Sequence, residues 1–356
     1  MHPVFTVLAC LCSTEDPPIV AKTYYFFNQI MADLQSPSQP GKRPAETRTV
    51  TEVESGQRLD NYLVRHLKGV PRTHIYRIVR DGQVRLNGGR VRPSVRVSEG
   101  DRVRVPPLRR DVSQNAGVGR GNSDFRASIL FEDSNLLVID KPPGIAVHGG
   151  SGLRGGIIEF LRSRSEQYLE LVHRLDKETS GVLVLAKDMA TLRSMHEALR
   201  QNVSQNRIRK SYQVLLVGQW RGGRRALSHR LQTVRRPGGV KRSQVDTRGR
   251  EAYSVFDPLE RYSEHTLMRV GIKTGRLHQV RAHAQAIGLP VAGDRVYGDS
   301  DQNRALRKLG LHRQFLHADR LRFTHPVTGR KVDIQAPLPE DLAGVLACLE
   351  TSRRES

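Results

Sequence analysis

The chain has 356 residues, enough for two domains of ordinary size. Its 58 Lys and Arg residues outnumber its 36 Asp and Glu residues, which gives a net charge of +22 and a pI near 10.6. This excess predicts a polyanionic partner, and because no apolar stretch of membrane-spanning length occurs, nucleic acid is favoured over a membrane. The alternative is a soluble protein that is merely basic.

Cys10, Cys12 and Cys348 are too scattered for a disulfide framework or a tetrahedral metal site, so we expect a cytoplasmic protein without a metal ion.

Residues 1–47 contain little that could build a hydrophobic core. The apolar run at 4–11 is very short for a secretion signal, and no positively charged segment precedes it. Met31 is a more ordinary start, followed by a stretch rich in Ser, Pro and Gly. We interpret 1–30 as an upstream extension whose translation is in doubt, and the rest of the segment as disordered.

The segment 48–110 is strongly basic and carries short helical patterns. Between Gln57 and Arg110 there are fourteen Lys and Arg residues and four acidic residues, a net charge of +10. Two apolar helical faces are formed by Leu59, Leu63 and Leu67 and by Ile75, Ile78 and Val79. Asp81-Gly82 predicts the end of the second helix, and 84–88 predicts a hairpin. Charges of one sign at this density repel each other unless a polyanion binds, although a solvated charged face is the alternative.

The start of the first of these helices, Arg58-Leu59-Asp60 followed by Leu63, resembles the S4 RNA-binding fold. The resemblance implies that the second helix faces RNA and presents Arg72, Arg77 and Arg80. The next segment, 111–124, is rich in Gly, Asn and Ser without an apolar period, so we expect a flexible linker.

The remaining chain predicts a catalytic domain at 125–350 and a short tail at 351–356. Apolar runs on either side of Ser134-Asn135 predict a hairpin, and helices are expected at 157–162 and after the capping residue Asp188. A strand entered by basic residues, including Lys210, is expected at 208–218. The Arg- and Gly-rich segment 221–250 predicts a hairpin or loop that faces RNA.

The central feature of this domain is the segment 171–187, in which two apolar runs enclose a polar loop. Asp176 lies in this loop, and Arg174 is a possible local counter-ion. Spacing alone also permits an ordinary surface turn with a solvated aspartate. The pattern His-Arg-Leu-Asp-x-x-Thr-Ser-Gly at 173–181 resembles the catalytic motif of the RluA-type pseudouridine synthases. This resemblance implies that Asp176 is the catalytic aspartate.

Other segments resemble further motifs of the same family, in family order. Lys141 begins a Pro- and Gly-containing motif, which implies a structural loop beneath the active site. Tyr212 matches the active-site tyrosine, and Arg281 matches the arginine that pairs with the catalytic aspartate. Leu277 departs from the usual threonine, so a hydroxyl contact there is in doubt. The segments 293–298 and 316–329 match structural landmarks, and the family implies an α+β fold: an S4 domain plus a core with a mixed, largely antiparallel sheet flanked by helices.

The resemblance also implies the chemistry. Formation of pseudouridine breaks the N1–C1′ bond of uridine, turns the uracil and rejoins it through C5, so no redox or group-transfer cofactor is required. Asp176 would attack C1′ or deprotonate C2′, and we expect Arg281 and hydrogen bonds from the Thr-Ser-Gly loop to favour its charged form. Arg174 would contact the flipped nucleotide or fill the space that the base leaves. Tyr212 would stack on the base or remove the C5 proton.

Motifs at 69–71, 89–93 and 148–153 resemble the family members that modify large-subunit ribosomal RNA. We therefore expect this RNA as the partner, and a monomer that needs no cofactor. Action at other ribosomal or transfer RNA sites is the first alternative. A non-catalytic S4 ribosome-associated factor and a glycosidase or nucleosidase are two others, although a second positioned carboxylate for a glycosidase is not evident.

Overall fold

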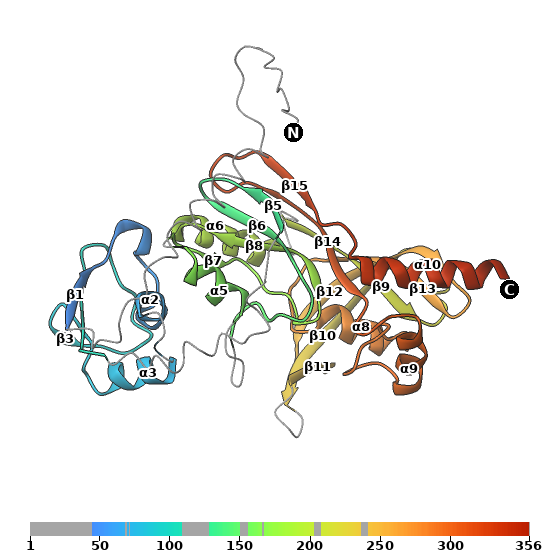
Figure 1. Cartoon of the computed structure of the whole chain (residues 1–356), viewed down its shortest axis with the longest axis horizontal. Helices are drawn as coiled ribbons and strands as arrows, with labels where there is room; N and C mark the ends of the chain where they lie inside the picture. The colour runs from blue at the N-terminus through green and yellow to red at the C-terminus, as the bar shows by residue number, and fades with distance from the viewer. Residues whose placement is uncertain are drawn as a thin grey trace, which may run out of the picture. The chain divides into compact units, whose positions relative to one another are not determined.

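A computed structural model describes residues 45–67, 70, 72–108, 128–149, 156–165, 167–202, 208–235 and 241–355. Most of the expected N-terminal extension, the expected linker 111–124 and residues 150–153 of the motif at 148–153 lie outside these residues. The described residues form two parts of the chain, each with its own sheet (Figure 1).

The N-terminal part is a small α+β unit. Its strands are β1 (Glu46–Thr49), β2 (Arg85–Leu86), β3 (Gly89–Arg90) and β4 (Arg102–Val105), in the order β1-β4-β2-β3. Its helical elements are the 3₁₀ turn η1 (Glu52–Glu54), α2 (Leu59–His66) and α3 (Arg72–Arg80). The predicted apolar faces of both helices are buried in one cluster with Val97 and Val103 of the strand region. Alternation of apolar and charged residues therefore gives this unit, whose first strand is β1, a core of its own.

The C-terminal part is built on a sheet of eleven strands. Nine of them follow the order β11-β10-β12-β13-β9-β14-β8-β6-β5, while β15 pairs with β14 and β7 pairs with β8. Their bounds are β5 Ser128–Glu132, β6 Leu136–Lys141, β7 Glu170–Leu171, β8 Ser180–Ala186, β9 Ile208–Val217, β10 Arg225–Arg235, β11 Lys241–Val245, β12 Arg250–Arg261, β13 His265–Ile272, β14 Leu316–Thr324 and β15 Lys331–Gln335. Among the described strand pairs, only that of β14 with β8 is parallel. The expectation of a mixed, largely antiparallel sheet is confirmed.

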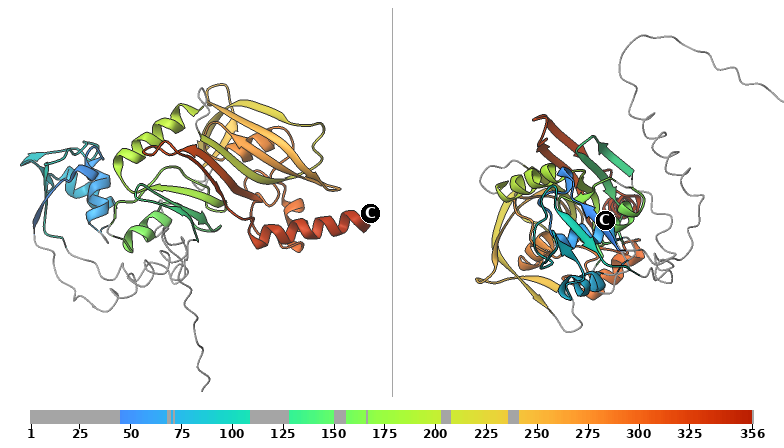
Figure 2. Two further views of the ribbon diagram at one scale, coloured as in Figure 1. Left: turned by 90° about the horizontal axis from the view of Figure 1, so that it is seen from above. Right: turned by 90° about the vertical axis from the view of Figure 1, so that its left-hand side faces the viewer.

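The strand β14 lies in the middle of the sheet and joins its two halves (Figure 2). Its contact with β8 is short and places Ala318 opposite Gly181. Gly181 has a φ of +109°, and a Cβ there would lie 2.2 Å from the carbonyl oxygen of Ala318. Both the backbone conformation and the close approach of β14 therefore require glycine at this position of the motif.

Helices cover both faces of the sheet. They are α5 (Ile157–Ser163), α6 (Met189–Arg200), α8 (Gln279–Ala286), α9 (Ser300–Lys308) and α10 (Glu340–Glu355). On β8, Leu183 packs in the cluster that contains α5, whereas Val184 packs in the cluster that contains α6. Because successive residues of a strand point to opposite faces, these two helices cover opposite sides of this half of the sheet.

The sequence predictions for this part agree closely with the observed elements. The hairpin across Ser134-Asn135, the helix after Asp188 and the strand from Ile208 are all present. Asp188 accepts a hydrogen bond from the amide of Thr191, as a capping residue does. The segment 221–250 forms the antiparallel pair β10–β11, and α10 continues through the expected tail to Glu355. Among the described helices, none combines the length and apolar character needed to cross a bilayer.

Candidate active site

Asp176 lies in the loop between β7 and β8, as the sequence predicted. The loop is anchored through its own polar side chains: Thr179 Oγ1 accepts a hydrogen bond from Gln314 Nε2 at 2.8 Å, and Ser180 Oγ lies 3.0 Å from His317 Nδ1. Within the described residues neither hydroxyl group bonds to the carboxylate of Asp176, which differs from the hydrogen bonds expected from this loop. The two contacts connect the loop to Gln314, just before β14, and to His317 in β14. They fix the position of Asp176 and make no direct contact with its carboxylate.

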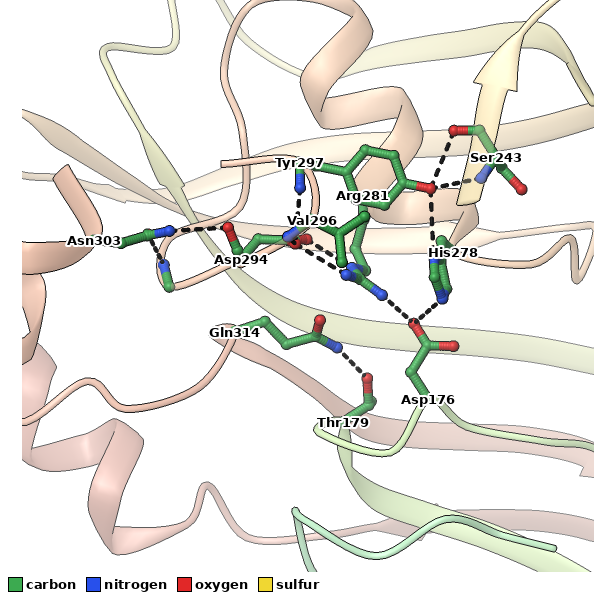
Figure 3. Close-up of polar contacts among 11 residues, drawn as sticks. Asp176, Thr179, Ser243, His278, Arg281, Asp294, Val296, Tyr297, Asn303 and Gln314 are labelled. Carbon is green, nitrogen blue, oxygen red and sulfur yellow. Dashed lines mark hydrogen bonds and ion pairs between the residues drawn. The ribbon is translucent and has the colours of Figure 1, made fainter. Parts of the chain in front are cut away.

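Arg281, on α8, contacts two carboxylates with one guanidinium group (Figure 3). Its Nη1 donates to Oδ2 of Asp176 at 2.9 Å, and its Nε and Nη2 donate to the two oxygens of Asp294 at 2.6 and 2.9 Å. The side chain of Asp294 is fully buried and that of Arg281 is 6% exposed, while Asp176 is 20% exposed. Asp294 therefore orients the guanidinium from inside the protein, and Asp176 contacts it from the more exposed side.

The charge state of Arg281 follows from these contacts. Burial alone would lower the pKa of Arg281, but the hydrogen bonds and charges of Asp294 and Asp176 outweigh this effect and raise the pKa above its ordinary value. Arg281 is thus a permanent cation between Asp294 and Asp176.

His278 also lies beside the acid, with Nε2 3.8 Å from Oδ2 of Asp176. Its Nδ1 lies 3.2 Å from the hydroxyl of Tyr297, which itself donates to the carbonyl of Ser243 and accepts from the Ser243 amide. The imidazole therefore lies between the Tyr297 hydroxyl on its Nδ1 side and Asp176 on its Nε2 side. Burial lowers the pKa of His278, although the charge of Asp176 acts in the opposite direction.

The backbone at His278 has a φ of +51°, the left-handed region that few residues other than glycine adopt. His278 is the N-cap of α8, and the next residue, Gln279, is held by four hydrogen bonds. Its Oε1 accepts from Thr274 Oγ1 and from the amide of Arg276, while its Nε2 donates to the carbonyl of Tyr253 and to Ser254 Oγ. These bonds stabilise the turn that places His278 in its unusual conformation. Strain maintained in this way is a common feature of functional sites.

Tyr212, on β9, lines the same cleft as Asp176. The cleft has a volume of about 740 Å³ and is also lined by Arg174, Leu277 and His278. Burial, with a smaller contribution from the charge of Asp176, raises the pKa of Tyr212 above its ordinary value. Its phenol is therefore neutral near pH 7 and presents an aromatic surface to whatever occupies the cleft.

Lys141, in the first motif, supports the acid loop from below. The lysine is completely buried, and its Nζ donates to the carbonyls of Pro142, Ile145 and Lys177 at 2.7, 2.9 and 3.1 Å. Burial lowers the pKa of Lys141 to about 7. Because Lys177 follows Asp176 directly, the lysine joins the motif loop to the loop of the acid, in agreement with its expected structural role.

The residues expected to bind RNA lie in two places. Arg174 is exposed and lines the cleft, and Lys210 lines it from β9, where burial lowers the pKa of Lys210 to about 8. Arg77 and Arg80 are exposed on α3. Arg72 begins the same helix, but its side chain lies outside the described residues.

Sequence reasoning brought together Asp176, Tyr212 and Arg281 but gave no role at the site to His278, Asp294 or Tyr297. Asp294 and Tyr297 were interpreted as structural landmarks. Only one signal pointed to Asp294, an acid between Gly293 and Arg295, thirteen positions after Arg281. A fully buried acid needs a cation, and Arg281 satisfies both it and Asp176.

Comparisons with known proteins show which proteins this chain is similar to. The family model described as RNA pseudouridylate synthase matches residues 135–286, and that of the S4 domain matches residues 57–103. The chain is 43% identical to ribosomal large subunit pseudouridine synthase C of Haemophilus influenzae, over 86% of this chain and 95% of that one. It is 44% identical to the protein of the same name from Escherichia coli, over 85% of this chain and 96% of that one.

A solved structure, human RNA pseudouridylate synthase domain containing 4, is also similar. It has a TM-score of 0.51 and 25% sequence identity, over 63% of this chain and 93% of that one. The extent of the sequence identity shows more than a shared fold. The chain belongs to the RNA pseudouridylate synthase family.

Proposed function

We propose that this enzyme converts uridines of large-subunit ribosomal RNA to pseudouridine, and that Asp176 is its catalytic residue. The observation that carries the proposal is the contact between Asp176 and Arg281 in a cleft lined by cationic side chains. The relatives named for the large ribosomal subunit support this RNA as the substrate.

Asp176 acts on the sugar of the bound uridine. Its carboxylate either attacks C1′ or removes the proton from C2′, and in both cases the N1–C1′ bond breaks and the uracil is released within the cleft. The uracil then turns and C5 bonds to C1′, while the Asp176–C1′ ester breaks in the first route or Asp176 returns the proton to C2′ in the second. The C5 proton leaves, and N1 takes up a proton. Reactant and product are isomers, so we propose a reaction without a redox or group-transfer cofactor.

The other cleft residues orient the base and the acid. Arg281 donates a charge-assisted hydrogen bond to the acid and is itself oriented by Asp294. Tyr212 stacks on the uracil. Burial raises its pKa, and this favours stacking over removal of the C5 proton, which would require an ionised phenol.

Access to a stacked uridine requires the nucleotide to leave its helix. Unstacking costs a few kcal/mol, which aromatic and cationic contacts in the cleft must offset. We assign Arg174 and Lys210 to these contacts, and Arg77 and Arg80 of α3 to the RNA backbone outside the cleft. We further propose that the protein acts as a monomer in the cytoplasm.

The decisive experiment is a map of pseudouridines in RNA from cells that lack this protein. We expect specific positions of large-subunit ribosomal RNA to stay unmodified, and to be restored by the wild-type protein but not by Asp176→Asn. If the missing positions lie in transfer RNA, the enzyme class stands and the substrate is wrong. If no position changes, the proposal fails.

The contribution of α3 is tested by Arg77→Gln together with Arg80→Gln. Each lost phosphate contact should lower the salt dependence of RNA binding, on a double-logarithmic plot, by a slope of about 0.7 to 0.9. Equal slopes for the variant and the wild type would show that these arginines do not contact RNA.

A further inference from the structure

A second large cleft lies on the opposite face of the catalytic sheet from Tyr212. It also has a volume of about 740 Å³, and strands β9, β12, β13 and β14 form its floor. On β9, Tyr212 belongs to the apolar core, while its neighbours Ser211 and Gln213 line this second cleft. Because side chains alternate along a strand, the two clefts occupy opposite faces of the same strands. We call this second cleft the rear groove.

Only part of this sheet face is covered by helices. Leu215 of β9 and Leu267 of β13 pack in one cluster with Leu306 of α9 and Val345 of α10. The rear groove lies beyond this cluster, toward the start of β9 and the end of β13, where Arg209, Gly271 and Lys273 line it. The fold therefore leaves a hollow in the sheet that no described helix fills.

The side chains around the rear groove are strongly cationic. Seven Lys and Arg residues line it, against two acids, Asp257 and Asp319. Arg320 and Arg322 are paired with Asp333 at 2.7 and 2.9 Å. Across the described residues, the other five cations of the lining have no carboxylate within ion-pair distance: Arg209, Lys210, Arg224, Arg269 and Lys273. Uncompensated charge of this kind around one hollow favours a polyanionic occupant.

The floor of the rear groove has features that suit a nucleotide. Gly271 lies in register between Val255 and Ser211, and a Cβ there would meet nothing closer than the Lys210 carbonyl at 3.9 Å. Neither packing nor backbone conformation requires this glycine, but its missing side chain deepens the groove. Beside it, the Nζ of Lys273 lies 4.9 Å from the centre of the Tyr253 ring. An aromatic ring next to cations is the combination that single-stranded nucleic acid binds by stacking and charge.

The rear groove adjoins the catalytic cleft. Lys210, Ile272 and Lys273 line both, at the start of β9 and the end of β13. We propose that the rear groove binds a segment of the RNA substrate next to the modified nucleotide, so that the strand passes from the catalytic cleft around this end of the sheet. The inference rests on the proposed function, because it takes RNA as the substrate.

Two sets of substitutions with equal charge change test the rear groove. The groove variant combines Arg209→Gln, Arg224→Gln and Arg269→Gln, at exposed positions that do not line the catalytic cleft. The control variant combines Arg307→Gln, Lys308→Gln and Arg330→Gln, which are exposed outside both clefts. Each set lowers the net charge by three. Lys210 and Lys273 are kept because they line both clefts.

The probe is a transcript of large-subunit ribosomal RNA, and binding is measured as a function of salt. For the groove variant we expect affinity at least tenfold weaker, and a slope of log affinity against log salt smaller by about 2 to 3, because three phosphate contacts are lost. The control variant should keep the wild-type slope. At saturating RNA, the groove variant should form pseudouridine at the wild-type single-turnover rate.

Two substitutions of Gly271 separate the effect of groove shape from that of charge. Gly271→Gln fills the floor of the rear groove without changing net charge, and Gly271→Ala adds one methyl group in open space. We expect the glutamine variant to weaken RNA binding and the alanine variant to bind like the wild type, with unchanged melting temperatures.

Equal behaviour of the groove and control variants would overturn the inference, and so would an effect confined to the catalytic rate. If an acidic protein and not RNA occupied the rear groove, RNA affinity would not change, and this result would also overturn the inference. If the wild-type protein binds the transcript through the rear groove but forms no pseudouridine, the proposed function fails and the groove assignment stands.

Discussion

Nη1 of Arg281 lies 2.9 Å from Oδ2 of Asp176, although 105 residues separate the two in the chain. The arginine comes from a helix and the acid from a loop between strands, so their contact depends on the whole sheet. Because Asp294 binds the same guanidinium from the buried side, the position of Arg281 does not depend on Asp176. The acid therefore meets a cation that is already oriented.

Asp176→Asn should abolish pseudouridine formation and leave RNA affinity within about twofold, because the change removes the reactive charge and almost no volume. Asp176→Glu keeps the charge but moves the carboxylate by one methylene, so we expect a large loss of rate here too. Single-turnover rates and binding constants on one transcript check both. Wild-type turnover by the asparagine variant would contradict the mechanism.

Arg281→Met should reduce activity far more than RNA binding, and it should also destabilise the fold by about 3–5 kcal/mol, because Asp294 is left buried without its cation. The double variant Arg281→Met, Asp294→Asn removes that buried charge and should recover most of the stability. It should still be inactive at neutral pH.

The single variant also separates catalysis from RNA binding. If Arg281 acts through Asp176, the loss of rate should persist when RNA is saturating. The single-turnover rate at saturating RNA measures it. A wild-type rate under these conditions, with weaker binding, would instead assign Arg281 to the RNA backbone.

His278→Asn should lower the single-turnover rate by about tenfold to a hundredfold without unfolding the protein. Asparagine tolerates the left-handed conformation, so the turn before α8 is kept while the ring that bridges Tyr297 and Asp176 is lost. His278→Phe keeps a ring without nitrogen atoms and should be equally slow. A phenylalanine variant with wild-type activity would show that the imidazole only fills space.

Gly181→Ala should destabilise the catalytic part by several kcal/mol, since its Cβ would overlap the carbonyl of Ala318 and its φ is strained for alanine. Gly271→Ala is the matched control in the same sheet, with open space around the new Cβ. Thermal unfolding compares the two. Similar melting temperatures would show that β14 can move away from β8 without cost.

Stability should fall as the pH decreases below about 6.5, and His283 is one cause. This histidine is fully buried, burial lowers its pKa to about 4, and neither ring nitrogen has a hydrogen-bond partner within the described chain. Between its folded and unfolded pKa values the unfolded state binds more protons, so acid favours unfolding, by on the order of 2 kcal/mol at pH 5.

His283→Leu should remove this contribution and flatten the decline of melting temperature between pH 7 and pH 5. His312→Gln, at an exposed position, is the control and should leave the decline unchanged. If the leucine variant declines as steeply as the wild type, other groups cause the acid sensitivity.

Much of the local structure follows from the order of residues alone. The apolar period of Leu59, Leu63 and Leu67 determines α2, and the capping residue Asp188 determines the start of α6. The loop that carries Asp176 is recognisable for the same reason, since it is enclosed by two apolar strands. These are short-range properties of the chain and need no knowledge of distant contacts.

The site itself required the tertiary structure. The sequence indicated Arg281 as the partner of Asp176 but not that Asp294 shares it, nor that Tyr297 contacts His278 beside the acid. It also suggested that the Thr-Ser-Gly loop hydrogen-bonds the acid, whereas Thr179 and Ser180 contact Gln314 and His317.

The physical reason is that hydrogen bonds and ion pairs act over a few ångströms, while their partners come from positions up to 137 residues apart. Periodicity and capping decide which segments become strands and helices. Only the pairing of those strands into one sheet decides which polar side chains meet, which buried charges are neutralised and which face of the sheet stays open.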